Sequence, residues 1–274
     1  MLRENNAGVT LAKGFKASGI KAGIKKSGKD DLAIIYSEVP ATVAGVFTQN
    51  LVAAAPVWVS KAVAQNGVGQ AIVANAGCAN ACTGEIGFAN AKKMAELTAK
   101  ELKVKAEEVF VASTGVIGVN LPMDKVESGI KKAATALDDN GSIAAGKAIM
   151  TTDTINKEIA VTFTIGDKKV TLGGMCKGSG MIHPNMCTML AFLTTDLAIS
   201  KELLQEALSE DIKDTYNMIS VDGDTSTNDT VLLFANGLAG NEEIREKNLD
   251  YEEFKKNGFE IEHMGDYDLT LENR

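Results

Sequence analysis

The feature that most constrains the fold is a glycine-rich loop that leads directly into an apolar run. The loop covers residues 177–188 and contains two glycines and a proline, which suit a tight turn. The run Met189–Leu193 follows it and has the length and composition of a buried strand. Thr188 is therefore expected at a junction between loop and strand, directly after the Cys187–Thr188 peptide bond.

A threonine at such a junction can act as a nucleophile if its own amine is free. A hydroxyl group is a weak nucleophile at neutral pH and needs an adjacent base. Cleavage of the Cys187–Thr188 bond would give Thr188 an α-amine, whose pKa of about 7.7 to 8.0 suits proton transfer near neutral pH. The local pattern leaves a second interpretation open, an ordinary glycine loop followed by an ordinary strand threonine.

Seven segments, in this order, carry a resemblance to a known family. They are Gly14–Lys29, Ala44–Pro56, Asn75–Gly84, Ser113–Gly118, Met150–Thr154, Lys177–Phe192 and Ser220–Thr230. Together they resemble the bifunctional ornithine acetyltransferase family of arginine biosynthesis, also called glutamate N-acetyltransferase. The family usually has alanine before the threonine, and Cys187 keeps a small side chain there.

The resemblance implies a fold and an activity. The fold class is α/β (α+β), with two β-sheets packed face to face and flanked by helices, and the chemistry is that of N-terminal nucleophile enzymes. Self-cleavage would divide the chain into an α chain, 1–187, and a β chain, 188–274, which associate as a heterotetramer in the family. The implied reaction is acetyl transfer from N2-acetyl-L-ornithine to L-glutamate through an acetyl-threonine intermediate. No metal or redox cofactor is needed, and acetyl-CoA is a possible additional substrate.

Roles for site residues follow from the same resemblance. Thr188 matches the nucleophile, and Cys187–Thr188 matches the cleavage site. Thr114 and Gly115 match the family's oxyanion-hole pair. The role suits these residues, because a hydroxyl group and a backbone N–H can both point at a developing negative oxygen.

Substrate-binding positions are matched at two further places. Thr151 or Thr152 is one of them, with Thr151 preferred, and Lys177 is the other. A lysine ammonium can bind a substrate carboxylate as a point charge. His183 is interpreted as structural, because the amine of Thr188 makes a separate base unnecessary.

The resemblance stops near Lys256, whereas relatives continue for well over a hundred residues. That continuation carries an acidic active-site residue in an Asp-Gly-Glu-Gly segment and terminal Asn and Ser/Thr substrate ligands, and residues 257–274 match none of them. An inactive truncated remnant is therefore one alternative to the transferase. An autoprocessed amidase or aminopeptidase is another, and a requirement for glutamate as acceptor would distinguish it.

Composition favours an intracellular enzyme. The 274 residues are 45% hydrophobic and carry a formal net charge of −8, which argues against binding to nucleic acid. The first residues lack the apolar core of a signal peptide, and no stretch of about twenty apolar residues predicts a membrane span. A cytoplasmic location follows, in which the four cysteines are reduced, and two histidines give no zinc-binding spacing.

Two glycine motifs are set aside as nucleotide sites. Gly23–Lys29 has the spacing of a phosphate loop, but Asp30 replaces the Ser or Thr that would bind magnesium. Gly67–Gly69 lacks the third glycine and the following helix of a dinucleotide fingerprint.

Periodicity predicts alternating strands and helices. The expected strands are Leu32–Ser37, Ala44–Thr48, Val57–Val59, Gln70–Ala74, Val109–Ser113 and Val231–Ala235, with a hairpin of Ile159–Ile165 and Lys169–Leu172. The expected helices are Asn90–Leu102, Val126–Leu137 and one capped by Ser200. Sheets covered by helices are the simplest packing for this pattern.

Overall fold

A computed structural model describes residues 2–5, 7–179, 189–215, 217 and 225–259. Its strands are β1 (Leu2–Asn5), β2 (Phe15–Ile20), β3 (Leu32–Phe47), β4 (Val68–Cys78), β5 (Val109–Val116), β6 (Lys157–Ile165), β7 (Lys168–Lys177), β8 (Leu190–Thr195) and β9 (Thr230–Ala235). Its helices are α1 (Ala55–Asn66), α2 (Gly84–Leu102), α3 (Met123–Thr135), α4 (Ser142–Ile149), α5 (Lys201–Asp214) and α6 (Leu249–Gly258), with a 3₁₀ turn at Ala106–Glu108.

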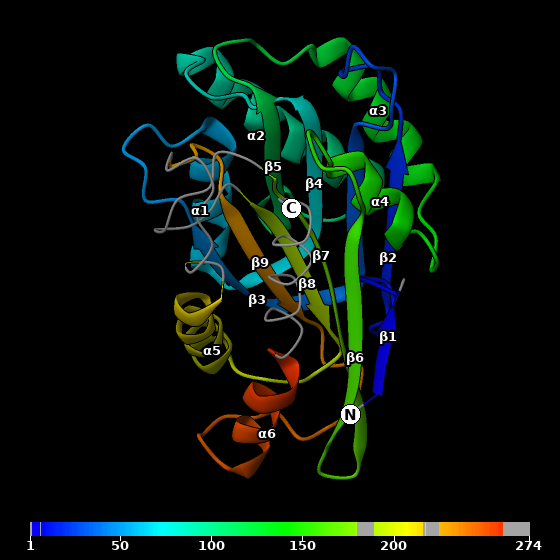
Figure 1. The fold of residues 1–274 in the computed structure, drawn as a ribbon, viewed down its shortest axis with the longest axis vertical. Helices are drawn as coiled ribbons and strands as arrows, with labels where there is room; N and C mark the ends of the chain where they lie inside the picture. Colours follow the sequence, from blue (N-terminus) through cyan, green and yellow to red (C-terminus); the bar gives the residue numbers. More distant parts are fainter. Residues whose placement is uncertain (1, 6, 180–188, 216, 218–224, 260–274) are drawn as a thin grey trace.

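The strand β3 joins the two halves of the sheet (Figure 1). The strand order is β1-β6-β7-β8-β9-β3-β4-β5, with β2 also paired to β3. Leu32–Tyr36 pairs with β4, whereas Thr42–Phe47 pairs with β9, and the register shifts between Tyr36 and Ala41. Bulges of this kind bend a strand. One hydrogen-bonded sheet therefore contributes strands to two layers.

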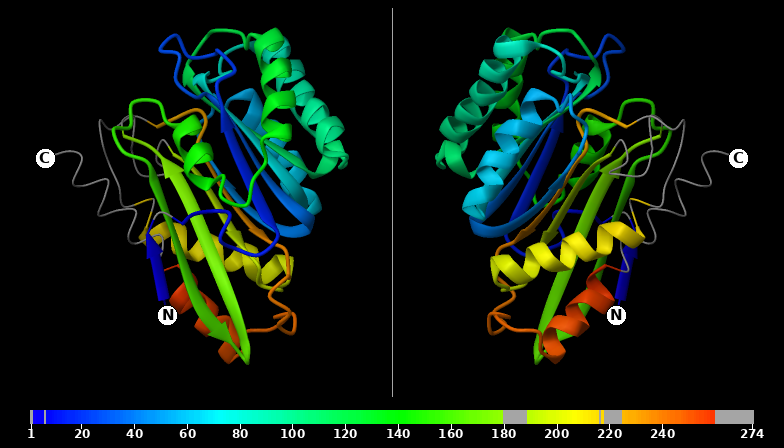
Figure 2. Two further views of the ribbon diagram at one scale, coloured as in Figure 1. Left: turned by 90° about the vertical axis from the view of Figure 1, so that its right-hand side faces the viewer. Right: turned by 90° about the vertical axis from the view of Figure 1, so that its left-hand side faces the viewer.

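Alternating side chains show how the two layers face each other. In β8, Leu190 and Phe192 belong to an internal cluster that also contains Ile72 of β4 and Phe110 of β5. The next residue along β4, Val73, points to a second cluster under α2 and α3. Figure 2 shows those helices on one side of the molecule, with α5 and α6 below the other strands. The predicted α/β class, with layered strands flanked by helices, is confirmed, and the two predicted sheets are joined through β3 into one hydrogen-bonded sheet.

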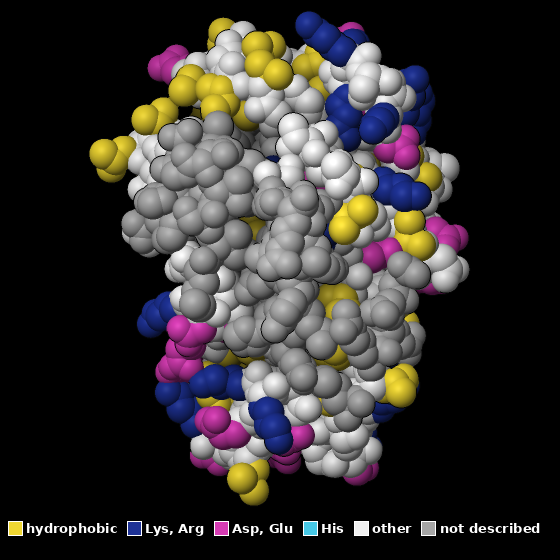
Figure 3. All heavy atoms as spheres, in the orientation of Figure 1, with side chains coloured by type: hydrophobic (Ala, Val, Ile, Leu, Met, Phe, Trp, Pro, Cys, Tyr) yellow, Lys and Arg dark blue, Asp and Glu magenta, His cyan; other side chains and the backbone are white. Residues whose placement is uncertain are grey.

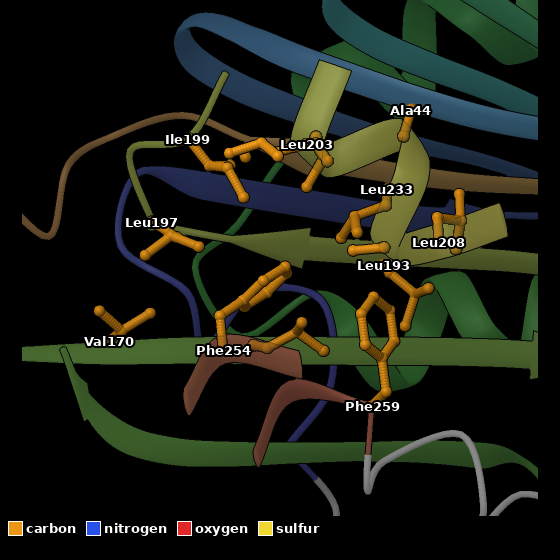
Figure 4. Packing of buried hydrophobic residues seen from close by; sticks show 14 of the residues in the cluster. Ala44, Val170, Leu193, Leu197, Ile199, Leu203, Leu208, Leu233, Phe254 and Phe259 are labelled. Atoms are coloured by element: carbon orange, nitrogen blue, oxygen red, sulfur yellow. The ribbon is translucent and has the colours of Figure 1, made fainter. Parts of the chain in front are cut away.

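Strands β6–β9 are covered by α5 and α6. Leu203 and Leu208 of α5 and Phe254 of α6 pack with Leu193 and Leu233, which lie on β8 and β9 (Figure 4). The predicted Ser200 cap is present, because its side chain accepts a hydrogen bond from the Leu203 N–H at 3.5 Å. Both faces of β8 and β9 are thus buried, as the continuous apolar runs predict.

The outer surface of this end is charged. Lys and Arg side chains are interspersed with Asp and Glu over the lower part of the molecule (Figure 3). Ion pairs join Lys247 to Glu206 and Lys255 to Glu210, and so connect α5 with α6 and the segment before it. Among the described residues, no helix has the length and apolarity needed to cross a bilayer.

Most predicted elements are confirmed, with two corrections. Val57–Val59 is not a strand but part of α1, because Pro56 occupies the first turn, where proline needs no N–H partner, and Val57, Val59 and Val63 share its buried side. Leu32–Ser37 and Ala44–Thr48 are not separate strands, because the single long β3 runs through both from Leu32 to Phe47.

Candidate active site

A cavity of about 870 Å³ lies beyond the C-terminal ends of β4, β5 and β7. It is lined by five residues predicted from the sequence, Thr114, Gly115, Thr151, Thr152 and Lys177. The predicted nucleophile Thr188, together with Cys187 and His183, lies outside the described residues. Met189, the next residue along the chain, leads into β8, whose Leu190 pairs with Lys177 of β7.

The Thr114–Gly115 pair occupies an unusual stretch of backbone at the end of β5. Gly115 has a φ of 130°, and a Cβ atom there would lie 2.6 Å from the Cys78 nitrogen. Glycine is therefore required for the close approach of β4 and β5, whose register shifts at this point. Thr114 beside it is only 6% exposed but still reaches the cavity wall.

A buried polar network holds this end of β5 in place. The Ser113 hydroxyl donates to Asn75 Oδ1 at 2.7 Å. The side-chain amide of Asn228 donates to Ser113 O at 2.9 Å and to Ala79 O at 2.7 Å. All of these side chains are buried. The peptide that precedes Thr114 is thus fixed by a residue far away in the sequence.

Lys177 is a buried lysine that lines the cavity. Its side chain lies at the end of β7 and the residue is 3% exposed. Burial lowers the pKa of the Lys177 ammonium group, and the nearby carboxyl groups of Asp153 and Asp229 oppose that shift. A negatively charged substrate group beside Lys177 would favour the charged form of the lysine.

Asp153 brings the two substrate-binding segments together. Its carboxylate accepts hydrogen bonds from the Gly178 N–H at 2.8 Å and the Thr151 N–H at 3.1 Å, and it pairs with Lys157 at 3.0 Å. Burial alone would raise the pKa of Asp153, but these donors hold it below its ordinary value. The residues after β7 are thereby attached to the residues after α4.

The two candidate threonines differ in their contacts. The hydroxyl groups of Thr152 and Ser179 lie 2.6 Å apart and share a hydrogen bond. Within the described part of the chain, the Thr151 hydroxyl has no such partner, and both threonines are exposed at the cavity. Thr151 therefore stays the preferred candidate.

Asp229 is the second buried acid near the site. It directly precedes β9 and is 1% exposed. Its Oδ1 accepts the Met189 N–H at 3.0 Å. Burial raises the pKa of Asp229 to about 8, and the opposing effects of the Met189 N–H, the Ser226 hydroxyl and the Lys177 ammonium group do not offset it.

The loop around Gly23–Lys29, which has the spacing of a phosphate loop, is folded around the carboxylate of Asp31. Asp31, which is fully buried, accepts hydrogen bonds from the backbone N–H groups of Ala22, Gly23, Ile24 and Lys25 at 2.6 to 3.1 Å. These are the donors that a phosphate loop would present to its ligand. Their use by Asp31 agrees with setting this motif aside as a nucleotide site.

A sequence profile of the ArgJ family matches residues 16–262. The chain belongs to the ArgJ family. The arginine biosynthesis bifunctional protein ArgJ 1 of Clostridium acetobutylicum is 56% identical over 252 residues, which are 92% of this chain and 62% of that protein. The ArgJ protein of Symbiobacterium thermophilum is 54% identical over 249 residues, with coverage of 90% and 62%. The chain thus spans about 62% of the length of these relatives.

Solved structures agree with this assignment. The ornithine acetyltransferase of Mycobacterium tuberculosis, solved in complex with ornithine, has 40% identity and a TM-score of 0.64, with 69% of this chain and 99% of that chain covered. An L-aminopeptidase D-Ala-esterase/amidase from Ochrobactrum anthropi, a variant of the Ntn hydrolase fold, has 12% identity and a TM-score of 0.54. It covers 98% of this chain and 87% of its own, and it shows the fold alone.

Three residues of this site carried no assigned role in the sequence. Asp153 belongs to the matching segment Met150–Thr154, and Asn228 and Asp229 belong to Ser220–Thr230. The segments were recognised, but Asn and Asp are also common turn residues. Only the burial and hydrogen-bond partners of these side chains distinguish a site residue from an ordinary turn residue.

Proposed function

We propose that this chain is an acetyltransferase that cleaves itself before Thr188 and transfers an acetyl group from N2-acetyl-L-ornithine to L-glutamate in arginine biosynthesis. The observation that carries the proposal is the convergence of Thr114, Gly115, Thr151 and Lys177 in one cavity, from three segments far apart in the sequence. Membership of the ArgJ family supports the same reaction. The start of β8, two residues after Thr188, pairs with the end of β7 that carries Lys177.

The first step of the proposal is self-cleavage. The Thr188 hydroxyl oxygen attacks the Cys187 carbonyl carbon, the peptide C–N bond breaks, and the Thr188 nitrogen takes a proton. Water then hydrolyses the resulting ester and leaves a Cys187 carboxylate, a free hydroxyl group and an α-amine on Thr188. Residues 1–187 and 188–274 are the proposed α and β chains, and their association as a heterotetramer is part of the same proposal.

The second step is acetyl transfer. The Thr188 hydroxyl attacks the acetyl carbonyl of N-acetylornithine while its amine accepts the proton and passes it to the departing ornithine amine. The Thr114 hydroxyl and the Gly115 N–H are the proposed donors to the negative oxygen of the intermediate. The glutamate amine then takes the acetyl group from the ester. Lys177 and Thr151 would bind the substrate backbone, with Lys177 opposite a carboxylate.

Acyl transfer of this kind proceeds without a metal or redox cofactor. Acetyl-CoA is a proposed alternative donor, because a thioester would acylate the same hydroxyl group with loss of a thiol. Glutamate acetylation from acetyl-CoA would then use the second half of the same cycle. We place the enzyme in the cytoplasm, where amino-acid biosynthesis takes place.

Intact-mass measurement of the purified chain tests the proposal. We expect two chains that begin at Met1 and Thr188, and a single uncut chain for Thr188→Ala. Thr188→Ser keeps a hydroxyl group and should still be cut. N-acetylornithine alone should add one acetyl group to the second chain, and glutamate should remove it as N-acetylglutamate.

Two results would contradict this function. An uncut wild-type chain that never gains an acetyl group would match the inactive-remnant alternative. Loss of the acetyl group to water at the same rate with and without glutamate would instead indicate an amidase or aminopeptidase.

A further inference from the structure

The walls of the cavity differ in chemistry. Thr151 and Lys177 provide polar groups from two segments that Asp153 joins. The stretch that directly follows the Thr114–Gly115 pair is mostly apolar. We call this stretch the apolar wall, and its cavity-lining residues are Val116, Ile117, Val119 and Pro122, with Asn120 between them. The candidate oxyanion hole is therefore continuous, along the chain, with a group of apolar side chains.

Three side chains of the apolar wall are large, apolar and exposed. The exposed fraction is 59% for Val116, 40% for Ile117 and 51% for Val119. Single exposed apolar residues are common on protein surfaces, whereas a group of them in the wall of a cavity is typical of a ligand site. The apolar wall thus offers hydrophobic surface to a ligand directly beside Gly115.

Hydrogen bonds hold the apolar wall against the segment that follows β4. The Ala79 N–H donates to Val116 O at 2.9 Å. The Cys78 thiol donates to Val119 O at 3.1 Å. Because this backbone is already fixed, a ligand that binds to the wall has little to order, and its burial is converted into affinity with a small entropic cost.

An acetyl group does not account for a wall of this size. Pockets for drug-sized ligands have volumes of about 300 to 1,000 Å³, and this cavity has about 870 Å³, far more than an acetylated amino acid needs. The Cα atoms of Gly115 and Ile117 are at most about 7 Å apart. An acyl chain of several carbons, with its carbonyl oxygen bound at Thr114 and Gly115, can therefore reach the Ile117 side chain.

The lysines of the loop at residues 22–31 also line the cavity. The Lys25 ammonium group donates to two backbone oxygens, Asp30 O at 2.5 Å and Ala148 O at 3.1 Å. The Lys26 side chain is exposed to solvent, and a long lysine side chain can keep its ammonium group in water. Neither lysine prevents an alkyl chain from packing on the apolar wall.

We propose that the cavity accepts acyl groups longer than acetyl, and that Ile117 and Val119 of the apolar wall bind the alkyl chain of an N-acylornithine donor. The inference rests on the proposed function and keeps its chemistry. The amide C–N bond of the donor breaks, ornithine leaves as the amine, and the glutamate amine takes the acyl group. N-hexanoylornithine and glutamate thus give ornithine and N-hexanoylglutamate.

An internal competition measures the acyl preference directly. The wild-type chain is incubated with glutamate and equal concentrations of N-acetylornithine and N-hexanoylornithine. The initial ratio of N-hexanoylglutamate to N-acetylglutamate, measured by mass spectrometry, equals the ratio of the two kcat/KM values. Full burial of one CH₂ group is equivalent to about fourfold in affinity. Because the wall is partly exposed, we expect a smaller gain, with a ratio above one and up to about tenfold.

Three variants make the test specific. Ile117→Ser and Val119→Ser remove apolar surface from the wall, and each should lower the product ratio by about two- to fivefold. Ile86→Ser is the matched control, because Ile86 is 60% exposed on α2 and does not line the cavity, and it should leave the ratio unchanged.

The outcomes separate the inference from the proposed function. A wild-type ratio below one, or a ratio that neither Ile117→Ser nor Val119→Ser lowers, would overturn the inference alone. A wild-type chain that forms neither acylglutamate would overturn the proposed function and the inference with it.

Discussion

The loop at residues 22–31 and the segment before β9 are both built around a buried aspartate, but the two acids are satisfied very differently. Asp31 is 0% exposed and accepts four backbone N–H groups, all from residues six to nine positions before it. Asp229 is 1% exposed and accepts one, from Met189, forty positions away.

The difference in hydrogen-bond donors distinguishes an aspartate that stabilises a loop from one with an unusual proton affinity near a cavity. A carboxylate surrounded by local donors stabilises its loop. Because Asp31 accepts the backbone N–H groups of this loop, they are not available to a phosphate ligand, and the spacing of Gly23–Lys29 does not predict a nucleotide site. A buried carboxyl group that accepts only one backbone N–H is costly, and such groups cluster at sites that need an unusual proton affinity. Asp229 borders the cavity residues, with Asn228 in its wall.

The largest effect is expected from Asp31→Ala. The change leaves four partly buried N–H groups without their acceptor. A fully buried one costs about 1 to 3 kcal/mol, so the free energy of unfolding should fall by about 2 to 4 kcal/mol in total. Urea titration measures it. Asp31→Asn keeps one acceptor oxygen and should lose clearly less. Equal losses for the two variants would show that the carboxylate is not what closes the loop.

Thr114→Ala should affect turnover rather than folding. Removal of one oxyanion donor typically lowers kcat by about a hundredfold to a thousandfold, and we expect a loss of at least tenfold in acetyl transfer to glutamate. Thr114→Ser retains the hydroxyl group and should retain most of the rate. An unchanged kcat in Thr114→Ala would show that the Thr114 hydroxyl group is not an oxyanion donor.

Asp229→Asn should change the pH dependence of stability. The pKa of Asp229 is about 8 in the folded chain and near 3.8 when unfolded, so the folded state binds a proton more tightly. Between these values stability should fall as pH rises, by at most about 1.4 kcal/mol per pH unit. In a Thr188→Ala background, urea titrations at several pH values should show a shallower slope for Asp229→Asn. Identical slopes would mean that Asp229 is already ionised.

The smallest effect is expected far from the site, at Lys247→Ala. Lys247 pairs with Glu206 on the exposed surface near α5. Exposed pairs contribute little, because water screens them and two long side chains lose freedom. The urea midpoint should stay within experimental error of the wild-type value. A clear shift would show that charge pairs between α5 and the segment before α6 contribute to stability.

Local sequence pattern was sufficient to predict the elements whose buried and exposed faces follow from nearby residues. The apolar run after Thr188 predicts the buried β8, and Ser200 predicts the start of α5. It failed at Val57–Val59, because valine-rich stretches favour strands unless a preceding proline and tertiary packing select a helix. It also missed β2, since its sequence, FKASGI, has only two large apolar residues, one at each end.

The sequence by itself determined the family, through ordered motifs, and with it the candidate residues Thr114, Gly115, Thr151, Lys177 and Thr188. The tertiary structure decided that the four described candidates line one cavity, because the bend in β3 and the pairing of β7 with β8 bring distant segments together. It also decided the state of Asp229. Burial and the number of donors set a carboxyl pKa, and both depend on strands that meet only in the folded chain.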